Sequence, residues 1–361
     1  MAAPVDDQRL LAARLEAQLL RSRGASRTEE VLERLLAVQA QDLRGARLAV
    51  RSRSTVEAAV DVDDALTDRR SAVVGWLCRG TLHLVGAEDY RWLHALTAPR
   101  LRSGIERRLR QLGVDAAAED RGVDTIARAV AERGPRTRGE LCTALDAAGV
   151  PTEGQALVHL LAAASLRGLI VRGPMRDGEH AFVDVDEWLG PAPDPLEEAE
   201  ALARLARRYL AGHGPAGAED LAKWAGIPLG RARAGLSAID EECTAVVGGL
   251  VRLATSPAPD AGEGAVMPAP SLLGAFDPVL HGWLDRTFIT GDHKPVVTTN
   301  GLFRPIALVG GRVAGIWSLA DGTLRLQLLE PVADADLQAL SGEAAAVLRY
   351  LGLPARDMIV A

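Results

Sequence analysis

Two glutamines, Gln39 and Gln41, are the first side chains in this sequence whose spacing suggests chemistry. They lie two residues apart at the end of an amphipathic run that includes Val31, Leu32 and Leu35. In a continuous helix their side chains would point about 200° apart. In extended or turning backbone, residues i and i+2 point to the same side. The two amides therefore share one site only where the chain leaves helical geometry. The alternative is that they satisfy local backbone groups.

Composition limits the classes of protein to consider. The chain has 361 residues, 48% of them hydrophobic, and a formal net charge of −7. This length predicts two to four domains with substantial cores. The negative total counts mildly against nucleic-acid binding, although such binding depends on local potential. One basic cluster could supply a local positive potential for such binding, or it could be a solvated helix face. It contains Arg100, Arg102, Arg107, Arg108 and Arg110.

Metal, redox and membrane chemistry find little support in the sequence. The three cysteines are far apart, and the seven histidines show no metal-ligand spacing. We therefore expect no metal and no cofactor. No apolar run reaches the ~18 residues of a spanning helix. The first seven residues lack the pattern of a signal peptide. We expect a cytoplasmic protein with no membrane partner.

The periodicity of the first part predicts helices and one hairpin. Helices are expected over 7–23 and from a cap at Ser26 or Thr28 into Gln39, followed by a short helix through 63–66. Residues 72–85 are rich in β-formers, and Arg79-Gly80 is a turn signal in their middle. This segment predicts a β-hairpin after the helices.

A helix–helix–turn–helix–hairpin order, typical of a winged helix, is predicted over 122–183. It recurs about 80 residues later, where Gly214-Pro215 repeats Gly134-Pro135 and leads into the same order of elements. With the first 85 residues as a further copy, the sequence predicts three winged-helix modules. Pro-rich linkers are expected at 191–198 and 255–264.

Short strands separated by Gly-containing turns dominate the last part of the chain. Asn300-Gly301, Gly310-Gly311 and Asp321-Gly322 are hairpin signals, and a closing helix is expected over 334–351. The predicted class is α+β, with three tandem winged-helix modules followed by a small antiparallel β-barrel, a curled sheet being the alternative. The expected strands are 287–290, 296–299, 306–309, 313–317 and 324–328. The expected domains are 1–115, 116–190, 196–255 and 265–361.

Winged helices most often bind DNA. Several motifs in this sequence then point to one particular family of winged-helix proteins. In order along the chain these are Val38 to Asp42, Trp76 to His83, Leu272 to Asp277, Asp285-Arg286, and Asn300 to Trp317. Together they resemble the AlkZ/YcaQ-type winged-helix DNA glycosylases over nearly the whole chain. The Gln-x-Gln of Gln39 and Gln41 is similar to the AlkZ-like branch. Asp42 comes one position too late for the Gln-x-Asp of the other branch.

The resemblance implies an enzyme and a substrate. The family's fold is tandem winged helices with a C-terminal β-barrel. The implied activity is that of a monofunctional DNA glycosylase that excises N7-alkylated guanine. The AlkZ-like branch acts on bulky adducts or interstrand crosslinks left by genotoxic natural products. The implied partner is double-stranded DNA carrying alkylated guanine, and the protein is expected to act as a monomer without a cofactor.

An amide suits this chemistry. N7-alkylation places a positive charge on the purine, so the glycosidic bond breaks without a general acid, through an oxocarbenium-like transition state. The enzyme must mainly hold a water on the opposite face of the sugar. A glutamine carbonyl can accept from that water but is too weak a base to deprotonate it early. We expect Gln41 to orient the water, and Gln39 to share it or to hold the sugar-phosphate.

Further residues are predicted to contact DNA. On the first hairpin, Arg79 is expected to contact phosphate and His83 to donate to phosphate or sugar, the alternative for His83 being a core histidine. Residues 291–295 are expected to form an exposed loop able to reach a groove. The predicted DNA-binding residues are Arg44, Arg79, Thr81, His83, His281, Arg286, His293 and Lys294.

Two other functions are compatible with parts of the sequence. A non-enzymatic winged-helix DNA-binding transcriptional regulator would use the same modules, but it would usually dimerise, and no sustained heptad pattern is present. A hydrolase of another kind has no Gly-x-Ser-x-Gly, His-Glu-x-x-His or Walker motif to support it.

Overall fold

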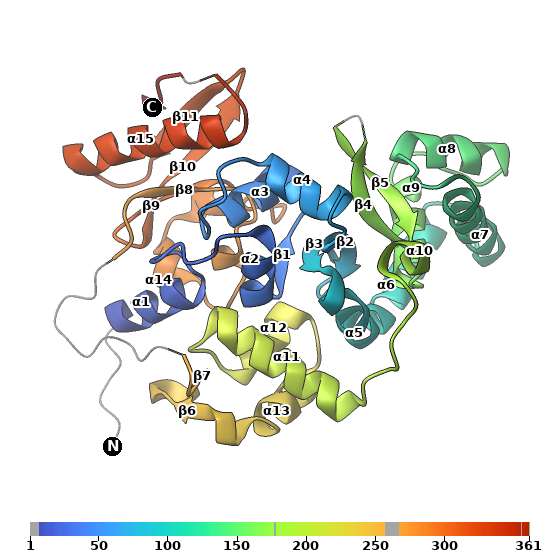
Figure 1. Cartoon of the computed structure of the whole chain (residues 1–361), viewed down its shortest axis with the longest axis horizontal. Coiled ribbons are helices and arrows are strands. Elements are labelled where there is room, and N and C mark those ends of the chain that lie inside the picture. The colour runs from blue at the N-terminus through green and yellow to red at the C-terminus, as the bar shows by residue number, and fades with distance from the viewer. Residues whose placement is uncertain (1–6, 177, 257–266, 355, 361) are drawn as a thin grey trace. The chain divides into compact units, whose positions relative to one another are not determined.

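The computed structural model describes residues 7–176, 178–256, 267–354 and 356–360 (Figure 1). The chain divides into two compact units. The first unit contains residues 1–62 and 202–361, and the second contains residues 63–201. The four domains expected from the sequence are a finer division and stay a prediction. Of the second predicted linker, residues 257–264 lie outside the described residues, as do residues 1–6.

In the first unit, the helix expected to run into Gln39 ends earlier. Helix α2 is Thr28–Leu35, and Leu36 follows with φ 65°. Strand β1 is Ala37–Gln39, and every residue from Leu35 to Ala40 is buried. A surface helix cannot bury consecutive residues on one face, whereas an enclosed extended segment can. Helices α1 (Asp7–Ala17), α3 (Leu43–Arg51) and the start of α4 (Val60–Thr67) complete this part.

The later part of the first unit contains three helices followed by two short strands. The strands form an antiparallel pair in which Thr244 lies opposite Arg252. This is the element order expected for residues 196–255. The elements are α11 (Glu198–His213), α12 (Ala218–Ala225), α13 (Leu229–Ser237), β6 (Cys243–Ala245) and β7 (Val251–Leu253).

The C-terminal sheet of the first unit is open, so the predicted barrel is wrong. Its strand order is β12-β11-β10-β9-β8, and β12 and β8 form its two edges. Helix α15 (Asp334–Tyr350) packs on one face through Leu340, Ala344 and Val347 (Figure 1). The strands are β8 (Ser271–Leu273), β9 (Ile306–Val309), β10 (Arg312–Ala320), β11 (Thr323–Leu328) and β12 (Ile359–Val360).

Two of the five predicted C-terminal strands are not strands. Residues Thr287–Thr290 form helix α14, because the carboxylate of Asp285 accepts from the N–H and hydroxyl of Thr287 and starts a helical turn. In the second case, Lys294–Val296 is a 3₁₀ turn with proline in its first positions, and Val297 after it forms only an isolated bridge with Phe303. The turn at Asp285 and the proline of the 3₁₀ turn therefore override the β-propensity of these residues.

The second unit has a sheet of two hairpins. Strands β2 (Ala72–Leu77) and β3 (Thr81–Gly86) pair in antiparallel register around the turn at Arg79-Gly80, which confirms the predicted hairpin. Strands β4 (Ile170–Arg176) and β5 (Glu179–Asp184) form the second hairpin, and β2 joins β4 where Val74 pairs with Arg172. The order within this unit is therefore β3-β2-β4-β5.

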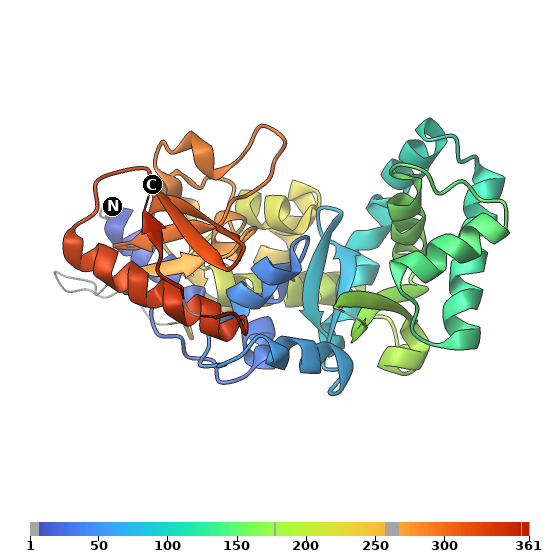
Figure 2. The ribbon, with the colours of Figure 1, turned by 90° about the horizontal axis from the view of Figure 1, so that it is seen from above.

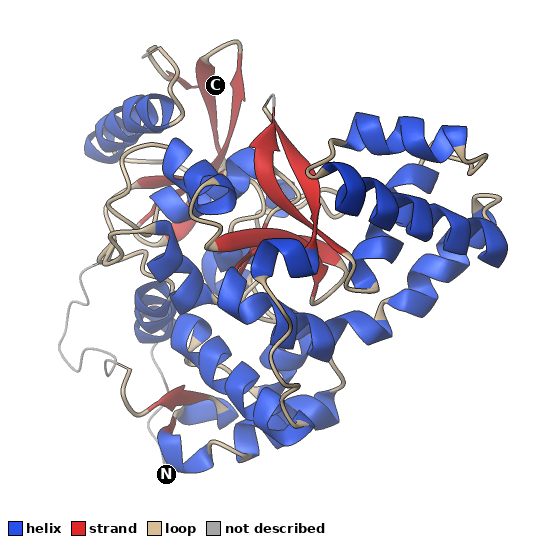
Figure 3. Cartoon of the chain, turned by 45° about the vertical axis from the view of Figure 1, so that its right-hand side comes forward, coloured by secondary structure: helices blue, strands red, loops and turns tan. Residues whose placement is uncertain are grey.

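Helices make up most of the second unit, as Figure 3 shows in blue. Helices α7, α8 and α9 lie together and precede the β4–β5 hairpin (Figure 2). Thr137 and Glu140 form a capping box at the start of α8. The number of winged-helix modules in the whole chain stays a prediction. The helices are α5 (Ala87–Thr97), α6 (Arg102–Gln111), α7 (Ala116–Arg133), α8 (Arg138–Ala147), α9 (Ala156–Leu166) and α10 (Val185–Leu189).

Within the described ranges, no helix is long and apolar enough to cross a membrane.

Candidate functional site

Gln39 and Gln41 touch each other in the structure. The amide Nε2 of Gln39 donates to Oε1 of Gln41 over 2.5 Å. Gln39 is 6% exposed, whereas the side chain of Gln41 is exposed to solvent. The geometry expected for a shared site is therefore present, because the backbone at Gln39 is extended and both amides point to one side.

The elements on either side fix this pair. Helix α2 ends at Leu35, and the turn at Leu36 leads into the buried strand β1. After Gln41, Asp42 caps α3, since its carboxylate accepts from the backbone N–H of Arg44 at 3.0 Å. Gln41 is thus the solvent-facing residue between a buried strand and a capped helix.

The arrangement gives Gln41 a defined acceptor. A carbonyl oxygen has two lone pairs, and one of those on Gln41 Oε1 receives the N–H of Gln39. The second lone pair and the Nε2 group remain available for a water or a substrate hydroxyl. Because Gln39 is buried, it orients the exposed amide and has little contact with solvent itself.

Close backbone packing positions the first turn of α3. A Cβ added to Gly45 would lie 2.3 Å from the carbonyl oxygen of Ala275, and one added to Gly274 would lie 2.8 Å from Cα of Gly45. Only glycine permits this approach. The segment after β8 therefore lies directly against the helix that follows Gln41.

A buried ion pair strengthens the same connection. Arg53 Nη2 lies 2.7 Å from Asp277 Oδ1, and Arg53 Nη1 lies 3.0 Å from Asp277 Oδ2. Both side chains are 0% exposed. Gln18 accepts from Arg53 at 2.9 Å and donates to the carbonyl of Gly212 at 2.8 Å. The network joins α1, the end of α3 and the segment after β8.

His281 and Arg286, two predicted DNA-binding residues, meet at an aromatic cluster. The ring of His281 lies 3.9 Å from that of Phe303 and is stacked on Phe276 at 6.1 Å. The guanidinium of Arg286 lies 5.0 Å from the centroid of Phe303. All four side chains are partly exposed. This Phe276–His281–Arg286–Phe303 cluster is a half-buried aromatic surface that carries a cation.

The other predicted residues of the first unit have different surroundings. His293 Nε2 lies 3.3 Å from Glu330 Oε2. Lys294 is exposed at the start of the 3₁₀ turn, and Arg44 is exposed on the first turn of α3.

Arg79, Thr81 and His83 belong to the second unit. His83 is 2% exposed, and its Nδ1 lies 2.9 Å from the carbonyl oxygen of Thr81. Burial, with the nearby charge of Arg79, lowers the pKa of His83 to about 3. A buried neutral imidazole suits a structural role in β3, and a contact of His83 with DNA stays a prediction. Arg79 is half-exposed in the turn.

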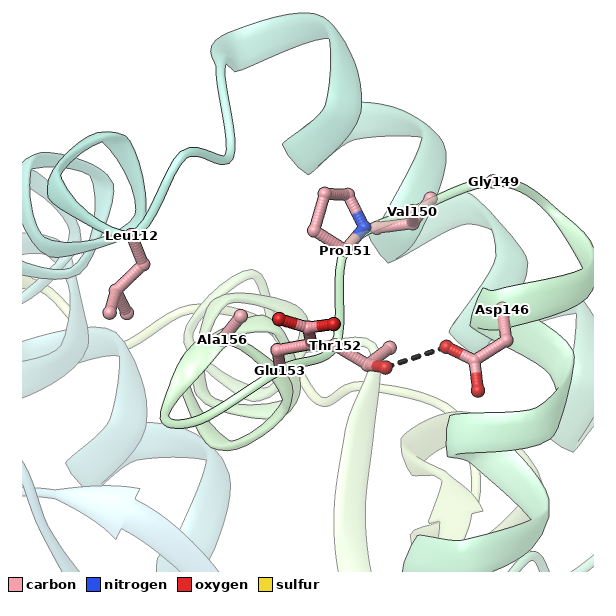
Figure 4. Close-up of a pocket in the computed structure, with 8 residues that line it drawn as sticks. All are labelled: Leu112, Asp146, Gly149, Val150, Pro151, Thr152, Glu153 and Ala156. Carbon is pink, nitrogen blue, oxygen red and sulfur yellow. Dashed lines mark hydrogen bonds between the residues drawn. The ribbon is translucent and has the colours of Figure 1, made fainter.

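Two pockets differ in character. A cavity of about 250 Å³ in the first unit is lined by Asp42 and Arg44, directly after Gln41 in the chain. A cavity of about 360 Å³ in the second unit lies at the α8–α9 turn, where Thr152 donates to Asp146 at 2.6 Å (Figure 4). The wall of this second cavity also contains Glu153. A phosphate bound there would therefore face two carboxylates, those of Asp146 and Glu153. We assign it no part in DNA binding.

The arginine cluster predicted from the sequence lies on and just before α6 of the second unit. All five of its side chains are exposed, which is compatible with either a solvated face or a phosphate-binding one. Among the described residues, no group of three or more His, Cys, Asp or Glu side chains is placed to hold a metal ion.

Sequence reasoning missed the residues that support the pair. Gly45, Gly274 and the Arg53–Asp277 ion pair act through contacts between segments more than 200 residues apart. The Leu272-to-Asp277 motif was the available signal. An acidic residue at the end of an apolar run calls for a buried partner, but it does not identify which arginine supplies it.

Comparisons with known proteins identify the family. The family described as DNA glycosylase AlkZ-like matches residues 32–350. An interstrand DNA cross-link repair glycosylase of Streptomyces sahachiroi is 27% identical over 367 residues, covering 96% of this chain and 96% of that protein. The structure of Streptomyces sahachiroi DNA glycosylase AlkZ has the same mixed α/β fold, with a TM-score of 0.78, 24% identity and complete coverage of both chains. Since the family match spans most of the sequence, this chain belongs to the AlkZ-like DNA glycosylase family.

Proposed function

We propose that this glycosylase hydrolyses the N-glycosidic bond of N7-alkylguanine in duplex DNA, with Gln39 and Gln41 as its catalytic pair. The observation that carries the proposal is the hydrogen bond from Gln39 Nε2 to Gln41 Oε1. It places two amides together on an extended segment, one of them buried and the other open to solvent.

The amides perform different tasks. Gln39 is held in strand β1, and its side-chain amide N–H fixes the rotamer of Gln41. Gln41 then presents a carbonyl lone pair to a water on the face of the sugar opposite the leaving base. The water needs positioning more than deprotonation, because the departing guanine is already cationic.

The weakness of this base also gives selectivity. An unmodified guanine leaves only if a general acid protonates it. Neither glutamine can donate a proton in that way, since a neutral amide does not titrate near pH 7. Normal bases are therefore expected to stay in place when they occupy the same position.

Bulky adducts and interstrand crosslinks are the lesion class that we propose. The solvent-facing position of Gln41 supports this choice, because a large substituent cannot enter a closed base pocket. The name of the Streptomyces sahachiroi relative, an interstrand DNA cross-link repair glycosylase, supports it as well.

We further propose that the enzyme is monofunctional. A lyase step usually needs a desolvated amine that attacks the sugar as an unprotonated nucleophile. The sequence contains only two lysines, Lys223 and Lys294, and both are exposed to solvent. Neither amine is desolvated, as such a nucleophile would need to be.

The test is excision from a duplex that carries one defined N7-alkylguanine, followed by cleavage of the abasic site with heat or base. The wild type should release the alkylated base and leave the strand intact until that treatment. Strand cleavage without treatment would contradict the monofunctional proposal. Tight DNA binding with no excision of any adduct would favour a non-enzymatic regulator.

Variants test the pair itself. Removing one positioned group of this kind costs about 10²–10³ in rate, so Gln41→Ala and Gln39→Ala should each lower the single-turnover rate by about that factor. The double variant should lose little more than either single variant, because the two amides act as one unit. Gln327→Ala is the matched control, since Gln327 is an exposed glutamine on β11. Wild-type rates in Gln41→Ala would refute the mechanism even if excision is real.

A further inference from the structure

We infer that the cavity beside Asp42 and Arg44 is a subsite for the N7 substituent of the lesion, and that it sets the preference for adduct size. This inference rests on the proposed function. The cavity lies wholly within the first unit and has a volume of about 250 Å³. At roughly 30 Å³ per water molecule, it admits one compact ring or a short branched chain, and not a whole nucleotide.

The cavity begins one residue after Gln41. Asp42 forms part of its wall, and consecutive Cα atoms lie about 3.8 Å apart. Arg44 and Gly45, on the first turn of α3, line the wall beyond Asp42. The cavity wall therefore begins at the residue next to Gln41, on the same short segment that carries the proposed catalytic pair.

The opposite wall is an open sheet edge. Strand β9 begins at Ile306. The backbone N–H of Trp317 on β10 donates to the carbonyl of Pro305, the residue just before β9, at 3.0 Å. Strand β10 continues beyond this point to Ala320. Successive residues of an antiparallel strand direct their N–H and C=O groups to alternate sides. Leu319, two residues after Trp317, thus directs its backbone groups to the side that β9 no longer covers.

The walls combine apolar surface with a few polar groups, as ligand pockets usually do. Leu48, Ala275 and Pro305 supply apolar contacts. Arg44 and the hydroxyl of Ser318 supply donors, and both side chains are exposed at the opening. The chemistry fits a compact apolar group that carries hydrogen-bond acceptors, such as a ring with carbonyl or ether oxygens.

A backbone phosphate fits this cavity less well. The carboxylate of Asp42 already occupies the N-terminus of α3, where it accepts from the N–H of Arg44. A phosphate at the same place would meet that negative charge and would compete for the same donors. The occupant we assign is therefore the uncharged adduct substituent.

The test changes the size of the cavity from its exposed side. Ser318→Trp introduces a large ring at the opening without altering a core residue. Gln327→Trp is the control, because Gln327 is an exposed residue of the neighbouring strand and is not part of the wall. The probes are identical duplexes that carry N7-methylguanine, N7-benzylguanine or N7-furfurylguanine, the last two being single-ring substituents. The readout is the ratio of single-turnover kcat/KM for each large substituent to that for methyl.

Loss of one buried apolar contact should lower this ratio about tenfold in Ser318→Trp, and Gln327→Trp should keep the wild-type ratio. Ser318→Leu should give a smaller decrease, and thermal unfolding checks that each variant folds. An unchanged ratio in a folded Ser318→Trp protein, or an equal loss for all three probes, would overturn the subsite. Failure of the wild type to release any of the three bases would refute the proposed function instead.

Discussion

Arg53 and Asp277 form a bidentate ion pair in which neither side chain is exposed, although the two residues are 224 positions apart. Burial of two charges is costly, and the cost is offset only when the geometry and the surrounding hydrogen bonds are good. Here Gln18 accepts a further hydrogen bond from Arg53, and Asp277 accepts the backbone N–H of Val279 at 3.0 Å.

Breaking this pair should destabilise the first unit. Asp277→Ala leaves a buried guanidinium without its counter-charge, so the free energy of unfolding should fall by about 3–5 kcal/mol. Chemical denaturation of the whole chain measures this value. Replacing both partners, as in Arg53→Met with Asp277→Leu, should recover part of the loss, because no charge then remains buried. A loss below about 1 kcal/mol in Asp277→Ala would match a solvent-exposed pair and contradict the geometry.

Gly45 should not tolerate a side chain. In Gly45→Ala the added Cβ would lie 2.3 Å from the carbonyl oxygen of Ala275, which is backbone and cannot rotate away. We expect a loss of about 1–3 kcal/mol in unfolding free energy, together with slower excision, because the turn of α3 after Gln41 must shift.

The matched control is Gly342→Ala in α15, where, apart from the adjoining residues and the backbone of the same helix, no described heavy atom lies within 4 Å of the added Cβ. Alanine is the better helix former, so this variant should gain about 0.5–1 kcal/mol. Equal stability of the two variants would mean that the segments containing Gly45 and Ala275 do not pack as described.

Local features of the fold were predictable from the sequence. The β2–β3 hairpin follows from a run of β-formers interrupted by Arg79-Gly80, and the turn lies where it was expected. The i and i+2 spacing of the two amides gave the condition for a shared site, namely that the chain leaves helical geometry, although the helix was expected to run into Gln39. In each case the signal and the structure lie within one short segment.

Features that depend on distant partners were not predictable. Strand β8 has only three residues, Ser271–Leu273, and it forms because it pairs with β9 more than 30 positions later. The edge strand β12 likewise pairs with β11 through Arg325 and Leu326. These edges leave the sheet open, whereas the run of Gly-containing turns had predicted a closed barrel.

The residues of the candidate site also divide into those that could be predicted from one short segment and those that depend on distant partners. The catalytic candidates are two residues apart in sequence, so their spacing indicated a possible shared site, with local backbone contacts as the alternative. Asp277 and Ala275 act on α3 from the far end of the chain. No periodicity in the sequence connects these segments, and only folding brings them together.

His83 should make the second unit sensitive to acid. Burial lowers the pKa of its imidazole from 6.5 to about 3. Between these values the unfolded chain binds a proton that the folded chain does not, so the contribution of His83 is fully present above about pH 6.5 and is lost as the pH falls. The expected slope is at most about 1.4 kcal/mol per pH unit.

The measurement compares chemical denaturation of the wild type and His83→Gln from pH 7.5 to pH 4. Glutamine does not titrate, so the difference in unfolding free energy between the two proteins should shrink as the pH falls. A difference that stays constant across this range would show that His83 titrates alike in the folded and unfolded chains.

Arg286 and Lys294 should bind phosphate. Both are cations of the first unit that follow the Leu272-to-Asp277 segment in sequence, and the guanidinium of Arg286 lies over the ring of Phe303. Each phosphate contact releases condensed counterions, so losing one contact lowers the slope of log affinity against log salt by about 1. Arg286→Gln and Lys294→Gln should each show this decrease and weaken binding to damaged and undamaged duplexes alike.

Arg325→Gln, which removes an exposed arginine of β11, is the control and should keep the wild-type slope. If both variants also keep that slope, these residues do not contact phosphate, and the arginines of α6 become the next candidates for the DNA-binding surface.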